Sequence, residues 1–141
     1  YTLSYTTLFR SFNESVTFDK FTFNGNNDGK QLTGVPGQVF VSSLQLKFPE
    51  RIYLYLEHNY TARIPLTDAN TVFADHYNLV QAKAGWQFVA NRKSKFEIYA
   101  GVGNLLNEKY SLGNDLNAVG NRYYNPAPLR NYYIGFNAGF K

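Results

Sequence analysis

Five side chains in the polar parts of the sequence have the chemistry to hold a bulky ligand. Aromatic faces and cationic groups can bind a large, often anionic molecule through ring contacts and charge. The candidate substrate-binding residues are His76, Tyr77, Arg122, Tyr123 and Tyr124. The alternative is that these rings fix the outer ends of strands at a membrane interface, as the aromatic girdles of β-barrels do. Both interpretations place the five residues in loops or at strand ends.

Asp68, Asp75 and His76 combine carboxylate oxygens with an imidazole and so raise the question of a metal site. They lack the tight ligand spacing of a metal motif, and a solvated loop is the better interpretation. The chain has no Cys, and its two histidines, His58 and His76, lie in different regions. No nucleophile with a base and an orienting acid can be assembled from them. We expect no enzymatic activity, no metal and no cofactor.

The elements that must position these residues follow a period of two, which is typical of β-strands with one apolar and one polar face. From Ile52 to Ile64, the even positions are mostly apolar, whereas the odd positions carry hydroxyl, amide and charged groups. The same alternation predicts six strands and no helix. The predicted strands cover residues 1–10, 40–48, 52–64, 80–88, 96–103 and 131–140.

Charged residues and glycines share the polar faces of these strands. Glu57, Arg63, Lys83 and Glu97 could line a permeation path, but cross-strand charge pairs in a wall are the favoured interpretation. The glycines on these faces suggest relief of crowding or curvature. They are Gly101, Gly103, Gly135 and Gly139.

The connections alternate in length. Short polar turns lie near 49–51 and 91–94, and long loops rich in Asn, Asp, Gly and Pro occupy 13–36, 65–76 and 111–129. Short turns at one end and long loops at the other are typical of outer-membrane β-barrels, where the long loops are extracellular. A soluble antiparallel β-sandwich also alternates apolar and polar residues and is the alternative.

Composition favours the membrane interpretation. Aromatic residues make up 18% of the chain, with 12 Tyr and 12 Phe, whereas charged residues make up only 17%. Soluble domains usually contain about 25% charged residues. No apolar run approaches the ~18 residues of a membrane-spanning helix. The net charge of +4 is not gathered into a basic run, so nucleic-acid binding has little support.

Six strands leave two open edges, which cannot face lipid because their backbone groups would lack hydrogen-bond partners. Single-chain bacterial barrels start at about eight strands. No signal peptide opens the chain, and Tyr1 begins directly in a patterned segment. We therefore expect residues 1–141 to be one part of a larger barrel.

Three segments resemble the C-terminal region of TonB-dependent receptors. They are Gly29–Pro36 (GKQLTGVP), Asn104–Tyr110 (NLLNEKY) and Tyr123–Arg130 (YYNPAPLR). The stretch 68–71 (DANT) also resembles a loop of that family, and the family's last strand typically closes with an aromatic residue, here Phe140. These elements follow the family's order over about 110 of the 141 residues. The sequence departs from the family at Thr33 and Leu129, and Lys141 follows Phe140.

The resemblance implies a transmembrane antiparallel β-barrel of which these are the last six of 22 strands, with the C-terminus in the periplasm. It implies active uptake of a scarce nutrient across the bacterial outer membrane, with a ferric siderophore as the favoured cargo and vitamin B12, haem or a carbohydrate as alternatives. The expected partners are outer-membrane lipid and lipopolysaccharide, the rest of the barrel with its plug, and the TonB complex. The plug and the TonB box lie outside this sequence. A plugless porin-like channel and a soluble binding module are the rival functions.

Overall fold

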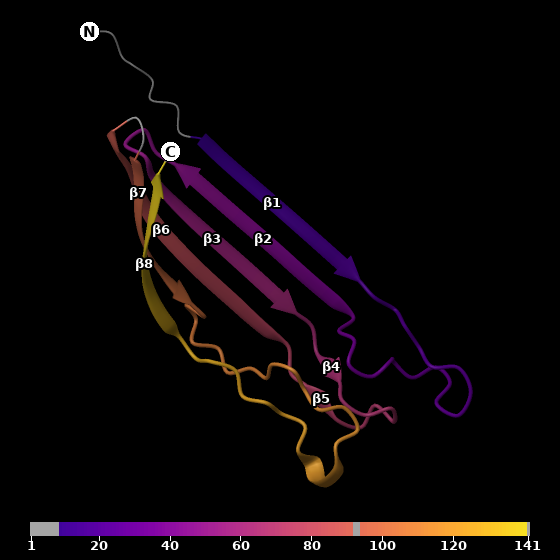
Figure 1. Cartoon of the computed structure of the whole chain (residues 1–141). Coiled ribbons are helices and arrows are strands. Elements are labelled where there is room, and N and C mark those ends of the chain that lie inside the picture. The colour runs from indigo at the N-terminus through magenta and orange to yellow at the C-terminus, as the bar shows by residue number, and fades with distance from the viewer. Residues whose placement is uncertain (1–8, 92–93, 141) are drawn as a thin grey trace.

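The computed structural model describes residues 9–91 and 94–140, in which the dominant element is one antiparallel sheet (Figure 1). The sheet has the strand order β1-β2-β3-β6-β7-β8. Its strands are β1 (Phe9–Phe18), β2 (Gln38–Lys47), β3 (Ile52–Thr61), β6 (Tyr77–Asn91), β7 (Ser94–Gly103) and β8 (Asn131–Phe140). A small separate hairpin of β4 (Ile64–Pro65) and β5 (Phe73–Ala74) lies in the loop between β3 and β6. The all-β class and the six-stranded antiparallel sheet are confirmed.

The first strand is not where the sequence pattern put it. We predicted a strand over residues 1–10 and a loop over 13–36, but β1 runs from Phe9 to Phe18 and therefore occupies the start of that loop. Residues 1–8 lie outside the described residues. The alternation in β1 is obscured because Glu14 falls on the same face as Phe12 and Val16. Pairing with β2, which the sequence alone does not reveal, fixes this segment as a strand.

The other strands agree with the prediction to within a few residues. The turn after β2 forms at 48–51, where Arg51 adopts a positive φ of 62°. The predicted strand 52–64 ends earlier, at Thr61, so Arg63 is not part of the sheet. A single 3-10 turn, η1 (Val119–Asn121), is the only helical element among the described residues. No helix in this described part is long and apolar enough to cross a membrane.

The register brings like residues together on each face of the sheet. Even-numbered residues form an apolar face, on which Leu44 lies opposite Leu56 and Leu56 opposite Ala82. Odd-numbered residues form a polar face, on which Glu57 lies opposite Gln81.

Polar side chains interrupt the apolar face near one end. Glu14 lies opposite Ser42, and Ser42 lies opposite His58. The Nε2 atom of His58 is 3.0 Å from Oδ1 of Asn78, at hydrogen-bond distance. The alternation places His58 on this face, and the structure agrees.

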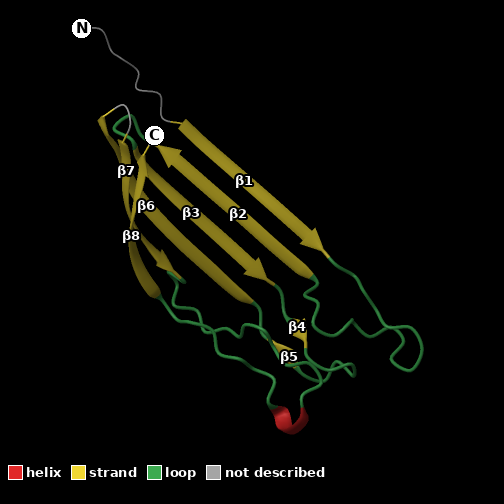
Figure 2. Ribbon diagram, viewed as in Figure 1, coloured by secondary structure: helices red, strands yellow, loops and turns green. Residues whose placement is uncertain are grey.

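The three long loops, 19–37, 62–76 and 104–130, gather at one end of the sheet, which we call the loop end (Figure 2). The opposite end, with the connections between β2 and β3 and between β6 and β7, is the turn end. The buried hydrophobic residues of the described chain, Leu66, Ala74 and Tyr123, all lie in these loops. In contrast, large apolar-face residues such as Ile134 (81% exposed) and Phe140 (75% exposed) are open on the surface of the sheet. A β-sandwich would bury one face of the sheet against a second sheet, and the described residues form no such second layer.

Candidate functional site

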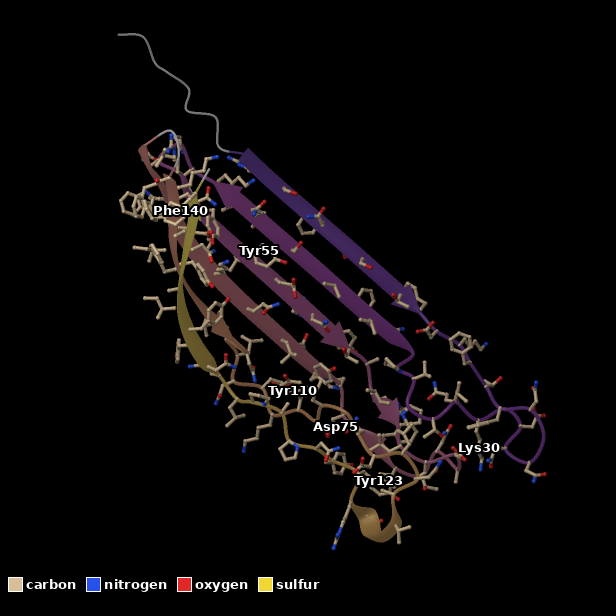
Figure 3. The ribbon with its side chains drawn as sticks, in the orientation of Figure 1. Lys30, Tyr55, Asp75, Tyr110, Tyr123 and Phe140 are labelled. Atoms are coloured by element: carbon tan, nitrogen blue, oxygen red, sulfur yellow. The ribbon has the colours of Figure 1, made fainter. Side chains whose placement is uncertain are left out.

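Two rows of rings cross the apolar face, one near each end of the sheet. Near the loop end, consecutive ring centroids are 5.8, 5.7 and 6.0 Å apart in the loop-end ring row of Phe18, Phe40, Tyr60 and His76. Near the turn end, neighbouring centroids are 5.0 to 6.0 Å apart in the turn-end ring row of Trp86, Phe88, Phe96, Phe136 and Phe140. Figure 3 shows Phe140 at the turn end of β8. Between the rows, the face is mainly aliphatic and includes Leu56, Ala82, Ala84 and Ala100.

On the polar face, neutral donors make the hydrogen bonds to the carboxylates of Glu57 and Glu97, and the charge of Lys83 also acts on Glu97. The hydroxyl of Tyr53 donates to Glu97 at 2.5 Å, and Asn137 donates to the same carboxylate at 3.0 Å. Glu57 accepts from the hydroxyl of Tyr55 at 2.5 Å and from Nε2 of Gln81 at 2.6 Å. The wall is therefore joined across strands by hydrogen bonds between charged and neutral side chains.

Lys83 lies above aromatic rings. Its Nζ is 3.9 Å from the ring centroid of Tyr99 and 5.7 Å from that of Tyr53. A cation–π contact of this kind stabilises the ammonium group, which also attracts the carboxylate of Glu97. Arg63 makes a similar contact outside the sheet, with its guanidinium 4.6 Å from the ring centroid of Phe73. The prediction that Arg63 belongs to the charged wall is wrong, because β3 has already ended at Thr61.

Tyrosine rings of the polar face cover glycines on neighbouring strands. A Cβ atom added to Gly135 would collide with the ring of Tyr99, and one added to Gly101 would collide with the ring of Tyr133. The ring of Tyr53 covers Gly85 in the same way. The predicted role of the polar-face glycines in relieving crowding is thus explained at Gly101 and Gly135, where each glycine makes room for a ring.

Two of the hollows on the polar face differ in charge. At the turn end, a hollow of about 640 Å³ includes Lys47, Arg51 and Lys83 in its lining. At the loop end, a hollow of about 360 Å³ is lined by Glu57, Asn59, Leu79, Gln81, Gly103, Asn104, Tyr110, Pro128, Asn131 and Tyr133. The second one, which we call the loop-end hollow, has no cationic residue in its lining. Most of its lining residues were not among the predicted site residues, because their proximity depends on strand register.

The structure separates the five predicted binding residues. Tyr77 and Tyr124 line one hollow of about 240 Å³, in which Tyr110 also takes part. Tyr77 packs against Tyr110 with ring centroids 4.9 Å apart, and the hydroxyl of Tyr124 donates to the backbone carbonyl of Phe73 at 3.0 Å. His76 belongs instead to the loop-end ring row of the apolar face.

Arg122 and Tyr123 lie in the last long loop, but they differ in exposure. Arg122 is exposed next to η1, whereas Tyr123 is only 8% exposed and packs in the loop core with Leu66 and Ala74. Tyr123 lies among the loops in Figure 3. Packing is the role that the structure describes for Tyr123, and ligand contact by the other four residues stays a prediction.

Short polar side chains join the three long loops. The carboxylate of Asp68 accepts hydrogen bonds from Thr33 at 2.6 Å and from Asn117 at 3.0 Å, and these bonds hold the pKa of Asp68 below its usual value, with Asn117 as the larger cause. Asn70 exchanges two hydrogen bonds with the backbone of Gln31, at 2.7 and 2.9 Å. The stretch 68–71, which resembles a family loop, therefore connects loop 62–76 to both of the other loops.

The carboxylate of Asp68 already accepts these two hydrogen bonds, which is relevant to the hypothesis of a metal site formed by Asp68, Asp75 and His76. Among residues 9–91 and 94–140, no group of three or more His, Cys, Asp or Glu side chains is placed to hold a metal ion. Asp75 and His76 form the two-residue connection between β5 and β6. The geometry of the loops is explained by hydrogen bonds within the chain.

A second polar residue organises the last loop. Asn104, which is 7% exposed, donates to the carbonyls of Glu108 at 2.8 Å and Pro128 at 3.3 Å and accepts from the amide of Glu108 at 2.8 Å. Asn107 accepts from the amide of Arg130 at 3.1 Å. The segment Asn104–Tyr110, noted above for its resemblance, is thus a hydrogen-bonded turn that ends β7 and positions the start of β8.

The comparisons with known proteins agree with this geometry. No family model matches the chain. The chain is similar to the crystal structure of the ferric-catecholate import receptor Fiu from E. coli K12, with a TM-score of 0.65 and 17% sequence identity over 93% of the chain. The chain spans 18% of that receptor's length. At this identity the likeness concerns the fold, and the chain therefore has the fold of a six-stranded segment of that receptor.

Proposed function

We propose that the chain forms part of the wall of a bacterial outer-membrane receptor that takes up a scarce nutrient, with a ferric siderophore as the favoured cargo, coupled to TonB. The observation that carries the proposal is the pair of ring rows on the apolar face, with aliphatic residues between them. Barrels that cross the outer membrane have an apolar band about 25 Å tall, flanked by two aromatic girdles. The fold likeness to a ferric-catecholate import receptor supports the class of cargo.

The spacing of the two rows agrees with such a band. Asn78 lies opposite Tyr60 of the loop-end ring row, and β6 continues from there to Phe88 of the turn-end ring row. These ten steps of strand extend roughly 33 Å at about 3.3 Å per residue. At a strand tilt of about 40°, the distance along the membrane normal is about 25 Å.

The positions of the polar residues on the apolar face also agree with a sheet that crosses the membrane between the two ring rows. Glu14, Ser42 and His58 lie one residue pair from the loop-end ring row, since Phe40 lies two positions before Ser42 and Tyr60 lies two positions after His58. The cost of a charged side chain facing lipid falls to about 0–1 kcal/mol near the interface. The long loops then lie outside the cell and the C-terminus lies in the periplasm. The proposed task is recognition and passage of a ligand, without bond making.

The test compares uptake in cells with and without the gene, under iron limitation. We expect the full-length protein to fractionate with the outer membrane, and we expect deletion to abolish growth on at least one defined ferric chelate. Uptake by a receptor coupled to TonB should stop when TonB is absent, whereas a porin-like channel should keep it. Unchanged growth on every chelate, or a protein that purifies without detergent, would contradict the proposal.

A further inference from the structure

The loop-end hollow lies where side chains of four strands meet on the polar face. Glu57 of β3 lies opposite Gln81 of β6. Gly103 of β7 lies opposite Asn131 of β8. Because Gly103 has no side chain, the amide of Asn131 lies directly over it, and Tyr110 and Tyr133 border the hollow beside them.

The charge of this hollow is unfavourable for an anion. Glu57 is the one charged residue in its lining, and the donors to its carboxylate are Tyr55 and Gln81, which are both neutral. Lys83, the nearest polar-face cation along β6, sits over the rings of Tyr99 and Tyr53. An anionic ligand in the hollow would therefore face a carboxylate with no cation in the lining, and juxtaposed like charges oppose binding.

The hollow offers neutral hydrogen-bonding groups instead. Nδ2 of Asn59, Oε1 of Gln81, Oδ1 of Asn131 and the hydroxyl of Tyr133 make no hydrogen bond with any described residue. They combine donors with acceptors, as the N–H and C=O groups of a ligand's amides require. The rings and Leu79 supply apolar surface beside them, which is the usual composition of a small-molecule site.

We propose that the loop-end hollow binds the outer surface of an uncharged iron chelate, such as a ferric trihydroxamate, in preference to an anionic chelate. This inference rests on the proposed function, because it requires the polar face to line the path of the cargo. It narrows the class of cargo, since a ferric tricatecholate carries net negative charge and a ferric trihydroxamate can be neutral. The free amide oxygens of Gln81 and Asn131 accept hydrogen bonds from N–H groups of the ligand, Nδ2 of Asn59 donates to its oxygens, and the tyrosine rings cover its apolar parts.

The experiment measures binding of a ferric trihydroxamate and a ferric tricatecholate to the full-length protein in intact cells. The wild type should bind the trihydroxamate more tightly. Gln81→Leu and Asn131→Leu should each weaken trihydroxamate binding about fivefold, since a hydrogen bond of about 1 kcal/mol is lost. Gln45→Leu is the matched control, because Gln45 faces the same side of the sheet but lines only the turn-end hollow.

Glu57→Gln tests the charge separately, because it removes the charge and keeps the size of the side chain and one of its two acceptor oxygens. Tricatecholate binding should strengthen several-fold, whereas trihydroxamate binding should change by less than about twofold. A wild-type preference for the tricatecholate, or equal effects of Gln81→Leu and Gln45→Leu at equal surface expression, would overturn this inference and leave the proposed uptake intact. Binding of neither chelate, together with unchanged growth after gene deletion, would overturn both.

Discussion

In the sheet, successive residues point to opposite faces. Neighbouring strands repeat the same hydrogen-bonded pairing over ten residues, as between β7 and β8. In the loops at its end, no such repeat exists, and order depends on single side chains such as Asp68, Asn70 and Asn104. A change in the sheet should therefore alter assembly of the whole wall, whereas a change in a loop residue should act locally. This difference predicts how large the effect of each substitution is and how far from the substituted residue it extends.

The largest effect is expected on the apolar face. Ala84 lies between the two ring rows, opposite Leu54, so Ala84→Arg would place a cation near the middle of the proposed apolar band. We expect the free energy of unfolding in lipid vesicles to fall by about 2–4 kcal/mol. Gln45→Arg, on the polar face, should change it by less than about 0.5 kcal/mol. Equal losses in the two variants would show that the faces are assigned wrongly.

A smaller effect is expected where a ring covers a glycine. Gly135→Ala would push a Cβ into the ring of Tyr99, and we expect a loss of about 1–3 kcal/mol in unfolding free energy. Gly139→Ala is the control on the same strand and face, since its Cβ would meet only the carbonyl of Lys95 at 3.9 Å. A double-mutant cycle with Tyr99→Leu should recover part of the loss. Additive losses would exclude the ring as the cause.

In the loops, Asn104→Ala should act strongly but locally. It leaves the carbonyl of Glu108 and the amide of Glu108 without their partner, for a local cost of about 1–2 kcal/mol. Hydrogen exchange should show faster exchange at the amide of Glu108, with little change in the strands. If protection in β3 and β6 falls equally, the loops and the sheet are one cooperative unit and the comparison fails.

The smallest effect is expected from the pH dependence of the Asp68 contacts. Hydrogen bonds from Asn117 and Thr33 lower the pKa of Asp68 in the folded protein, so its contribution is present above the ordinary Asp pKa of about 4 and is lost as pH falls through the lowered value. Proteolysis of loop 62–76 should therefore accelerate only in strongly acidic buffer. Asp68→Asn should be cleaved faster at neutral pH and should lose this acid dependence. A midpoint near neutral pH would assign the effect to another group.

The sheet was largely predictable because the period of two is carried by each strand separately. In β3, for example, Leu54 and Leu56 alternate with Tyr53 and Tyr55 without reference to any other segment. The strand β1 was misplaced because Glu14 interrupts the alternation of this segment. The segment is identified as a strand only by its pairing with β2, in which Glu14 lies opposite Ser42. A strand whose assignment depends on its neighbour cannot be identified from its own residues.

The candidate site was less predictable for a related reason. Glu57 and Gln81 are far apart in sequence, and only the register between β3 and β6 brings them into one hollow. The choice of Tyr123 as a binding residue followed from its ring and its loop, but its burial against Leu66 depends on how two loops pack. Residue type indicated the chemistry that was present, whereas pairing and packing decided which groups can meet a ligand.

The chain's single tryptophan, Trp86, has a spectroscopic consequence. Its indole lies in the turn-end ring row, half exposed at 50%, with its ring centroid 5.0 Å from that of Phe88. Indole emission shifts to shorter wavelength when water around the ring is replaced by lipid, and brominated acyl chains quench it according to depth. On the placement proposed above, Trp86 would report membrane insertion of this segment, and its quenching profile is expected to place the turn end of the sheet at the inner boundary of the bilayer.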